Sequence, residues 1–350
     1  MRASIGVDVG TTDTKCCVLM DDAVVFETRM PTAVLKVDAQ MIFFDPRLVW
    51  DQVANMLQLA LDKVAGANHC VISIVCQAPS ICAWSASGFS LGVSYLAHYG
   101  DPTRNSKVER RSKSQQRISD LLLRIPMDQE CYFSCLTGYL VYQATGVVTV
   151  DAITAWEMGI EQTSDEEAIW SQIFPHTHPL LAAPFDRFSL NCSQLLVDAD
   201  ISLQVLAGTT DSAVLPLYVW PDFPEYHVYL GTWGSLLQTG ILSSKAYCRS
   251  LWSGDLHTWM ISVPDFAQRY RQDTQVLTLF LSEVATRLPK GASLGISGGL
   301  LRSKRPEILN LTRHFLPDSR LILAPDNSTA IGAARLGLIA LDENCEEEKS

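Results

Sequence analysis

The chain has 350 residues, 47% of them hydrophobic, and a formal net charge of −11. The length predicts two or three domains, and the apolar share is large enough to build their cores. The negative charge argues against a surface that binds nucleic acid. No apolar run reaches the roughly 18 residues that a transmembrane helix needs, and we expect no signal peptide before Ile5. These features predict a cytoplasmic protein without a membrane segment.

Ten cysteines are scattered along the chain without a Cys-x-x-Cys pair. Cys16 and Cys17 are adjacent, and Cys76 and Cys82 lie in or beside apolar runs. This placement is typical of reduced, buried thiols in the cytosol and not of a disulfide framework.

Residues 5–19 form the most informative stretch of the first half. They read as an apolar strand that carries one acid, Asp8, then a turn through Gly10, Thr11 and Thr12, then a second apolar strand. A buried carboxylate is costly unless something pairs with it, and Mg²⁺ is a natural partner. The turn offers the backbone N–H groups and hydroxyls that a phosphate chain needs. We expect a β-hairpin that grips metal-bound phosphate; the alternative is an ordinary hairpin with a polar tip.

The rest of the first half indicates an α/β domain. A helix is predicted from Pro46 to about Val64, with Asp45 as its N-cap and Pro46 in its first turn. Further strands are predicted at residues 23–28, 70–76, 81–85 and 91–96, and a second helix at residues 130–144.

The second half repeats this order of elements after a composition shift, and we place the domain boundary close to Ser202. Residues 1–202 are expected to form one domain, residues 203–341 a second, and residues 342–350 a frayed acidic tail. Strands are predicted at residues 203–207, 226–231, 235–241, 259–263, 294–296 and 321–323, and helices at 212–218, 274–288, 306–315 and 328–341. Each half contains a strand pair with a Gly-Thr turn, so two facing lobes would form a cleft for a nucleotide triphosphate.

In their order along the chain, several of these segments resemble motifs of the FGGY family of carbohydrate kinases, which belongs to the superfamily of actin-like, hexokinase-like and heat-shock-chaperone-like ATPases. The segments are residues 5–15 (first phosphate motif), 44–50 (entry to the first helix), 72–77 (strand ending at the sugar pocket), 136–138 with 148–151, 207–211 (catalytic aspartate), 230–232 (second phosphate motif), 297–299 (adenosine motif) and 330–334 (closing helix). The resemblance implies an α/β fold of two ribonuclease H-like domains with a nucleotide cleft between them.

The resemblance also implies roles for individual residues. Asp211 would be the general base on the acceptor hydroxyl and would contact the substrate; the alternative is a plain N-cap of the helix that follows it. Asp8 would hold Mg²⁺ through water, since Mg²⁺ gives up its water ligands reluctantly. ATP would be contacted by Gly10, Thr11, Thr12, Lys15, Gly231, Thr232, Gly298, Gly299 and Asn327, although Lys15 could equally be a surface lysine. The sugar would be contacted by Gln77, Asp101 and Arg104, with a polar cap of the strand end as the alternative for Gln77.

The sequence departs from the family pattern at several points. The stretch from Asp101 to Arg104 is one residue longer than usual, and Trp233 and Leu300 replace smaller residues. Residues 239–292 form a shorter span than the family's usual second domain, so we expect lid-like insertions to be missing.

Together these features predict a Mg²⁺- and ATP-dependent kinase of a sugar or polyol, similar to xylulose, glycerol or gluconate kinases, with Asp8 and Asp211 on opposing lobes. One alternative is an ATP-binding pseudokinase or regulatory protein of the same fold with little turnover. Another is an actin-like assembly protein. The sequence names neither the sugar nor the oligomeric state, although the resemblance favours a homodimer.

Overall fold

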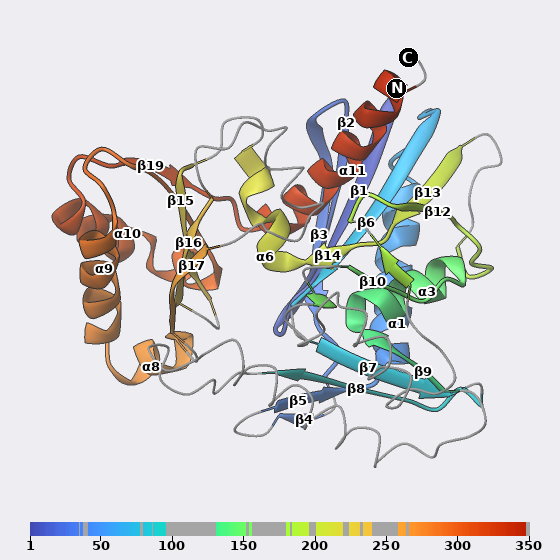
Figure 1. Cartoon of the computed structure of the whole chain (residues 1–350), viewed down its shortest axis with the longest axis horizontal. Coiled ribbons are helices and arrows are strands. Elements are labelled where there is room, and N and C mark those ends of the chain that lie inside the picture. The colour runs from blue at the N-terminus through green and yellow to red at the C-terminus, as the bar shows by residue number, and fades with distance from the viewer. Residues whose placement is uncertain are drawn as a thin grey trace, which may run out of the picture.

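The computed structural model describes residues 1–34, 36–37, 41–77, 80–85, 87–95, 131–151, 154–155, 180–182, 184–195, 201–219, 224–231, 234–239, 258–263 and 266–347. Two sheets lie side by side, each with helices packed against it, and a third sheet lies below the first (Figure 1). None of the described helices is long and apolar enough to cross a membrane. Of the eight cysteines in the described ranges, none is in a disulfide and seven are buried, as expected.

The first sheet contains the predicted hairpin. Its seven strands run in the order β12-β13-β6-β1-β2-β3, with β14 paired to β6. β1, β2 and β3 form an antiparallel meander, whereas β6, β13 and β14 run parallel to β1 or to one another. The strands are β1 (Arg2–Val9), β2 (Asp13–Met20), β3 (Ala23–Pro31), β6 (His69–Cys76), β12 (Arg187–Ser189), β13 (Ser202–Leu206) and β14 (Thr209–Thr210).

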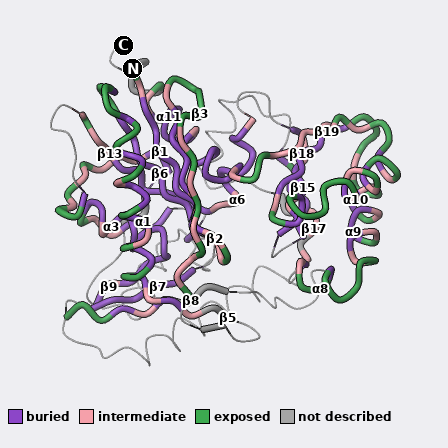
Figure 2. The backbone as a smooth tube through the Cα atoms, turned by 180° about the vertical axis from the view of Figure 1, so that it is seen from behind, coloured by how far each residue is buried: buried purple, intermediate pink, exposed green. Residues whose placement is uncertain are grey.

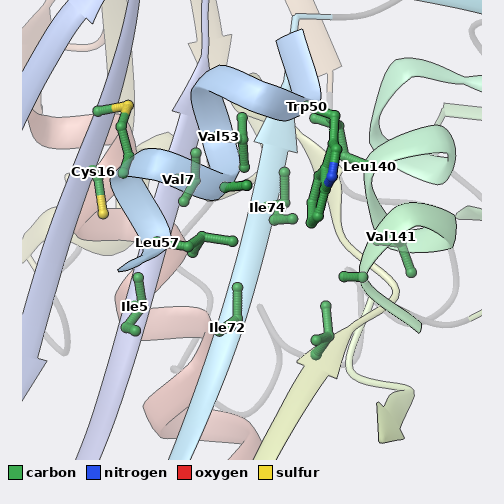
Figure 3. Close-up of a cluster of buried hydrophobic side chains, with 14 of the residues drawn as sticks. Ile5, Val7, Cys16, Trp50, Val53, Leu57, Ile72, Ile74, Leu140 and Val141 are labelled. Atoms are coloured by element: carbon green, nitrogen blue, oxygen red, sulfur yellow. The ribbon is translucent and has the colours of Figure 1, made fainter. Parts of the chain in front are cut away.

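One face of the first sheet is covered by α1 (Pro46–Leu61) and α3 (Leu136–Thr145) (Figure 3). The expected start of α1 is confirmed, because the Asp45 side chain accepts from the Arg47 N–H and Pro46 occupies the first turn. Val53 and Leu57 on α1 are fully buried over the strands. Burying each such side chain stabilises the folded state by about 1.5–3 kcal/mol relative to leaving it exposed. This layer therefore forms the main core of the lobe.

The other face is covered by α11 (Ser328–Glu347), α6 (Asp211–Val214) and the 3-10 helix η1 (Leu215–Val219). α11 extends the prediction, because it continues to Glu347 through most of the expected tail. An ion pair between Arg2 and Asp342 ties its far end to the first strand, and the two termini lie close together (Figure 1). The last helix of the chain therefore belongs to the lobe that contains the first strand.

The second sheet, which forms the second lobe, has five strands in the order β17-β16-β15-β18-β19. Its elements are β15 (Tyr226–Leu230), β16 (Gly234–Gln238), β17 (Thr258–Val263), β18 (Ser293–Ser297), β19 (Arg320–Leu323), α8 (Phe266–Gln272), α9 (Gln275–Arg287) and α10 (Gly299–Phe315). The inner faces of α9 and α10 are buried and their outer faces are exposed (Figure 2). α10 starts seven residues earlier than the predicted Pro306 and kinks at Lys304, because a proline inside a helix removes a backbone donor and crowds the preceding turn.

The third sheet corrects the predicted helix at residues 130–144. Residues Cys131–Cys135 instead form β9, which pairs antiparallel with β7, and α3 begins only at Leu136. Local periodicity cannot reveal this pairing, because the partner strand lies about 50 residues earlier in the chain. The sheet runs β4-β5-β8-β7-β9, with β4 (Lys36–Val37), β5 (Met41–Phe44), β7 (Ser80–Ser85) and β8 (Ser90–Tyr95); β10 (Thr149–Asp151) and β11 (Leu180–Ala182) form a separate pair.

Sheet pairing does not change at the expected boundary near Ser202. β13 and β14 continue the first sheet by pairing with β6, and α6 and η1 pack beneath α11 on the same lobe. The second sheet begins with β15, and the chain returns to the first lobe with α11. The segment that carries Asp211 is therefore part of the first lobe.

Candidate active site

Three parallel strands of the first sheet end at one edge, and each is followed by a predicted site residue. Val9 of β1 pairs with Cys76 of β6, and Cys76 pairs with Thr210 of β14. Gly10, Gln77 and Asp211 are the next residues after these three strands. Open α/β sheets bind ligands outside the carboxyl ends of their parallel strands. The topology thus brings together residues that lie about 200 positions apart in the sequence.

Asp8 is buried beside this edge, with 4% of its surface exposed. The Lys15 ammonium donates to Asp8 Oδ2 over 3.2 Å, and the Asp8 charge raises the pKa of Lys15. This pair offsets part of the cost of burying the carboxylate. Lys15 therefore faces the site and is not a free surface lysine.

The turn between β1 and β2 is held in place by Thr32. The Thr32 hydroxyl donates to the Gly10 carbonyl over 2.8 Å, and the Thr32 N–H donates to the Thr12 carbonyl over 2.9 Å. Within the turn, Gly10 N–H donates to the Asp13 carbonyl. Thr12 is exposed at the tip. A turn fixed in this way keeps its outward groups in position for a ligand, which is what a phosphate loop requires.

Asp211 lies at the start of α6 but is not its N-cap. Thr210 is the cap, since its hydroxyl accepts from the Ala213 N–H over 3.3 Å. The alternative reading of Asp211 as the cap is therefore wrong. Asp211 Oδ1 accepts from the Ser212 N–H over 2.7 Å, and the side chain remains partly exposed.

The electrostatic environment raises the pKa of Asp211 to about 7. Burial is the largest cause, the Asp8 charge is the second, and the Ser212 N–H and Lys15 act in the opposite direction. A carboxylate whose pKa lies near neutral pH is suited to accept a proton and to release it again.

Asp151 supports this segment, a role that sequence reasoning missed. It is 1% exposed, and its Oδ1 accepts from the Thr209 hydroxyl over 3.0 Å and from the Thr154 N–H over 3.1 Å, while the Thr154 hydroxyl donates to Oδ2. Gly208 precedes Thr209 with a φ of +76°, and a Cβ there would lie 2.5 Å from the Ile74 carbonyl oxygen. The segment leading to Asp211 is therefore fixed on both sides. In the sequence, the signal for this role of Asp151 was an acid at the end of a short strand, Thr149–Asp151.

A small pocket opens beside the same edge. Its lining includes Gly10, Thr11, Phe44, Gln77 and Ser80. The Gln77 side-chain oxygen is buried there and has no hydrogen-bond partner among the described residues. A buried amide oxygen without a partner costs about 1–3 kcal/mol unless a ligand satisfies it, so Gln77 is well placed to accept from a bound hydroxyl.

On the second lobe, the two glycine-rich turns also meet at one edge. β15 and β18 are parallel neighbours with Tyr229 opposite Ser297, so Gly231 and Gly298 follow the ends of adjacent strands. Gly298 has a φ of +108°, and a Cβ on it would lie 2.4 Å from the Leu230 carbonyl. Asn327, just before α11, has a buried side-chain oxygen without a partner in the described part of the chain. Thr232, Trp233, Asp101 and Arg104 lie outside the described residues.

The two acids lie on one lobe, which corrects the expectation that they face each other from opposing lobes. Asp8 is in β1, and Asp211 follows β14 in the same sheet. β6 lies between these strands, so their backbones are about 10 Å apart at the usual strand spacing. Gly231 and Gly298 are the residues that the second lobe contributes.

The residues at this edge fit a magnesium ion that arrives with a nucleotide. Among the described residues, no three or more metal-ligating side chains gather to form a self-contained metal site. Mg²⁺ commonly binds one or two carboxylates and completes its shell with water and substrate phosphates. Lys15 pairs with Asp8 Oδ2, which leaves Asp8 Oδ1 without a partner among the described residues. Asp8 can therefore supply a carboxylate oxygen to Mg²⁺.

The adjacent glycines Gly298 and Gly299 are expected to differ in their tolerance of a methyl group. Gly298→Ala should lower the free energy of unfolding by about 2 kcal/mol, because its φ is positive and the Cβ would meet backbone atoms. Gly299→Ala should change it by less than about 0.5 kcal/mol, because nothing lies within 4 Å of the added carbon. Urea unfolding of both variants measures the difference; equal losses would contradict the assigned geometry.

The chain matches no family model, and no curated protein matches its sequence. Solved structures of sugar kinases nevertheless resemble it. Glycerol kinase from Plasmodium falciparum with ADP aligns with a TM-score of 0.69 at 11% identity, covering 98% of this chain and 90% of that chain. Xylulose kinase from Rhodospirillum rubrum gives 0.66 at 16% identity, covering 97% and 90%. Gluconate kinase from Lactobacillus acidophilus gives 0.65 at 14%, covering 98% and 90%.

At these identities the likeness shows the fold alone. It confirms the expected fold class, an α/β protein built of two lobes like those of these kinase structures.

Proposed function

We propose that the protein is a Mg²⁺- and ATP-dependent kinase that phosphorylates a hydroxyl group of a sugar or polyol, and that it is a short member of the FGGY family. The observation that carries the proposal is the gathering of Asp8, Gln77 and Asp211 at three parallel strand ends. The raised pKa of Asp211 and the glycine turns of the second lobe support it. The similar structures of glycerol, xylulose and gluconate kinases have the same fold.

In the proposed reaction, the Asp211 carboxylate orients the acceptor hydroxyl and takes its proton. The acceptor oxygen forms a bond to the γ-phosphorus of ATP while the bond from that phosphorus to the bridging oxygen breaks, and its electron pair leaves with ADP. Magnesium, when bound with the nucleotide, would neutralise charge on the phosphates. Asp8 would hold the ion, and Gln77 would accept from a second acceptor hydroxyl. Because Asp211 must be ionised, the rate should rise with pH up to about 7.

Gly10, Thr11, Thr12 and Gly231 would approach the phosphates, with Thr232 beside them. Gly298, Gly299 and Asn327 would lie along the adenosine. The reduced cysteines support a cytoplasmic site of action. A homodimer is proposed only from the family resemblance.

ADP release measured over a panel of sugars and polyols tests the proposal. We expect one acceptor class to raise ADP production well above the rate with ATP alone, and acceptor phosphate to form in equal amount. Thermal stabilisation by Mg²⁺ and ATP without turnover on any acceptor would instead support the pseudokinase. Nucleotide-dependent sedimentation would support an assembly protein.

A further inference from the structure

Tyr229 belongs to the face of β15 that is turned toward the first lobe. Its neighbours Val228 and Leu230 are fully buried in the core of the second lobe, so strand alternation directs Tyr229 and His227 to the opposite face. The His227 ring meets Tyr218 of η1 edge-on, with 5.9 Å between ring centroids. Because η1 continues directly from α6, this face of β15 lies against the segment that carries Asp211.

The Tyr229 hydroxyl lies at the glycine turn that follows β15. A Cβ placed on Gly231 would be only 2.5 Å from this hydroxyl, so the absence of a side chain on Gly231 makes room for it. The residue is partly exposed, and its hydroxyl has no hydrogen-bond partner within the described ranges. The Tyr229 hydroxyl is thus held beside the turn proposed to approach the phosphates.

The charges around Tyr229 keep this group protonated. Burial and the negative charges of Asp211 and Asp8 all raise the pKa of the phenol above its ordinary value. A neutral hydroxyl can donate to an anionic phosphate oxygen, and such charge-assisted bonds are stronger than bonds between neutral groups.

We propose that the Tyr229 hydroxyl donates a hydrogen bond to the γ-phosphoryl group of ATP, which makes Tyr229 a further residue of the transfer site. This inference rests on the proposed kinase function. Tyr229 keeps its proton throughout: the acceptor proton goes to Asp211, and the electron pair of the broken phosphorus–oxygen bond leaves with ADP. Its contribution is to stabilise charge on the phosphoryl oxygens during transfer.

Tyr229→Phe, compared with Tyr226→Phe, tests the inference. Tyr226 is on the same strand but packs against the core of the second lobe, so it serves as the matched control. Calorimetry with Mg²⁺ and either the nonhydrolysable analogue AMP-PNP or ADP separates a contact with the γ-phosphate from a contact elsewhere. Tyr229→Phe should weaken AMP-PNP binding about tenfold and leave ADP binding within about twofold. Its kcat should fall about tenfold with an unchanged acceptor KM, and Tyr226→Phe should match the wild type.

The outcomes separate this inference from the proposed function. Unchanged AMP-PNP affinity in Tyr229→Phe, or equal weakening of both nucleotides, would overturn the role of Tyr229 while leaving the kinase proposal intact. If the wild-type protein bound neither nucleotide, the proposed function and this inference would both fail.

Discussion

Replacing Asp211 by asparagine is expected to lower the kcat for acceptor phosphorylation by about a hundred- to ten-thousandfold, the usual contribution of a positioned general base. Asparagine has nearly the same shape, and its side-chain oxygen can still accept from the Ser212 N–H. It cannot take a proton from the acceptor. Binding of Mg²⁺ and ATP should therefore persist while ADP release in the presence of the acceptor is lost.

The same substitution should stabilise the free protein above neutral pH. The pKa of Asp211 is raised from 3.8 to about 7, so the folded state binds this proton more tightly than the unfolded state does. Stability is therefore lost as the pH rises from about 4 to about 7, and the full cost remains above 7. Asp211→Asn removes that cost. Because the side chain is partly exposed to screening solvent, the expected gain at pH 8 is on the order of 1–2 kcal/mol.

Thermal melts at pH 8 and pH 5, together with the ADP-release assay, measure both effects. Asp318→Asn is the matched control, because Asp318 is an exposed acid outside the site, and it should change neither activity nor stability. A stability gain at pH 8 that is smaller at pH 5, combined with lost turnover, is the expected result. Turnover within a few-fold of the wild type would remove Asp211 from the role of base.

Local patterns predicted those parts of the fold that local forces determine. The hairpin of β1 and β2, the capped start of α1 and the strands of the second lobe follow from apolar runs, turn residues and caps. β9 was missed because its strand conformation depends on pairing with β7. The lobe to which residues 202–219 belong was missed for a similar reason: it is decided by pairing with β6 and packing under α11.

In the site, too, the local sequence identifies single residues but not the contacts between distant segments. Asp8 and Asp211 could be selected because each acid stands next to a glycine-threonine turn. That both acids lie at one edge of a sheet could not be predicted, because it depends on β1 and β14 each pairing with β6. Asp151 lies in a segment that resembles a family motif, but nothing local to Asp151 or Tyr229 indicates what either side chain contacts. Their importance follows from contacts with Thr209 and Gly231 that exist only in the folded chain.

Gly6→Ala is expected to lower the free energy of unfolding more than Gly298→Ala does, because the added methyl group pushes β1 away from α11. A Cβ on Gly6 would lie 2.1 Å from the Ala330 carbonyl oxygen and 2.3 Å from the Ala334 backbone nitrogen. Both atoms belong to the backbone of α11, so no change of rotamer can relieve the overlap. Overpacking of this kind costs about 3 kcal/mol, or roughly 4 °C in Tm for a protein of this size. Gly299→Ala adds the same methyl group where there is open space and is the control.

The displacement of α11 should also reduce catalysis. Gly332 of α11 packs against the backbone of Val214 in α6, where a Cβ would lie 2.1 Å from the Val214 carbonyl oxygen. α11 thus touches both the strand that carries Asp8 and the helix that begins at Asp211, so a shift of this helix changes the separation of the two acids. Gly6→Ala should therefore lower kcat at temperatures well below its own Tm, where the protein remains folded. A variant with the wild-type Tm would contradict the packing of α11 on β1, and one with a lowered Tm but the wild-type kcat would show that α11 stabilises the lobe without positioning Asp211.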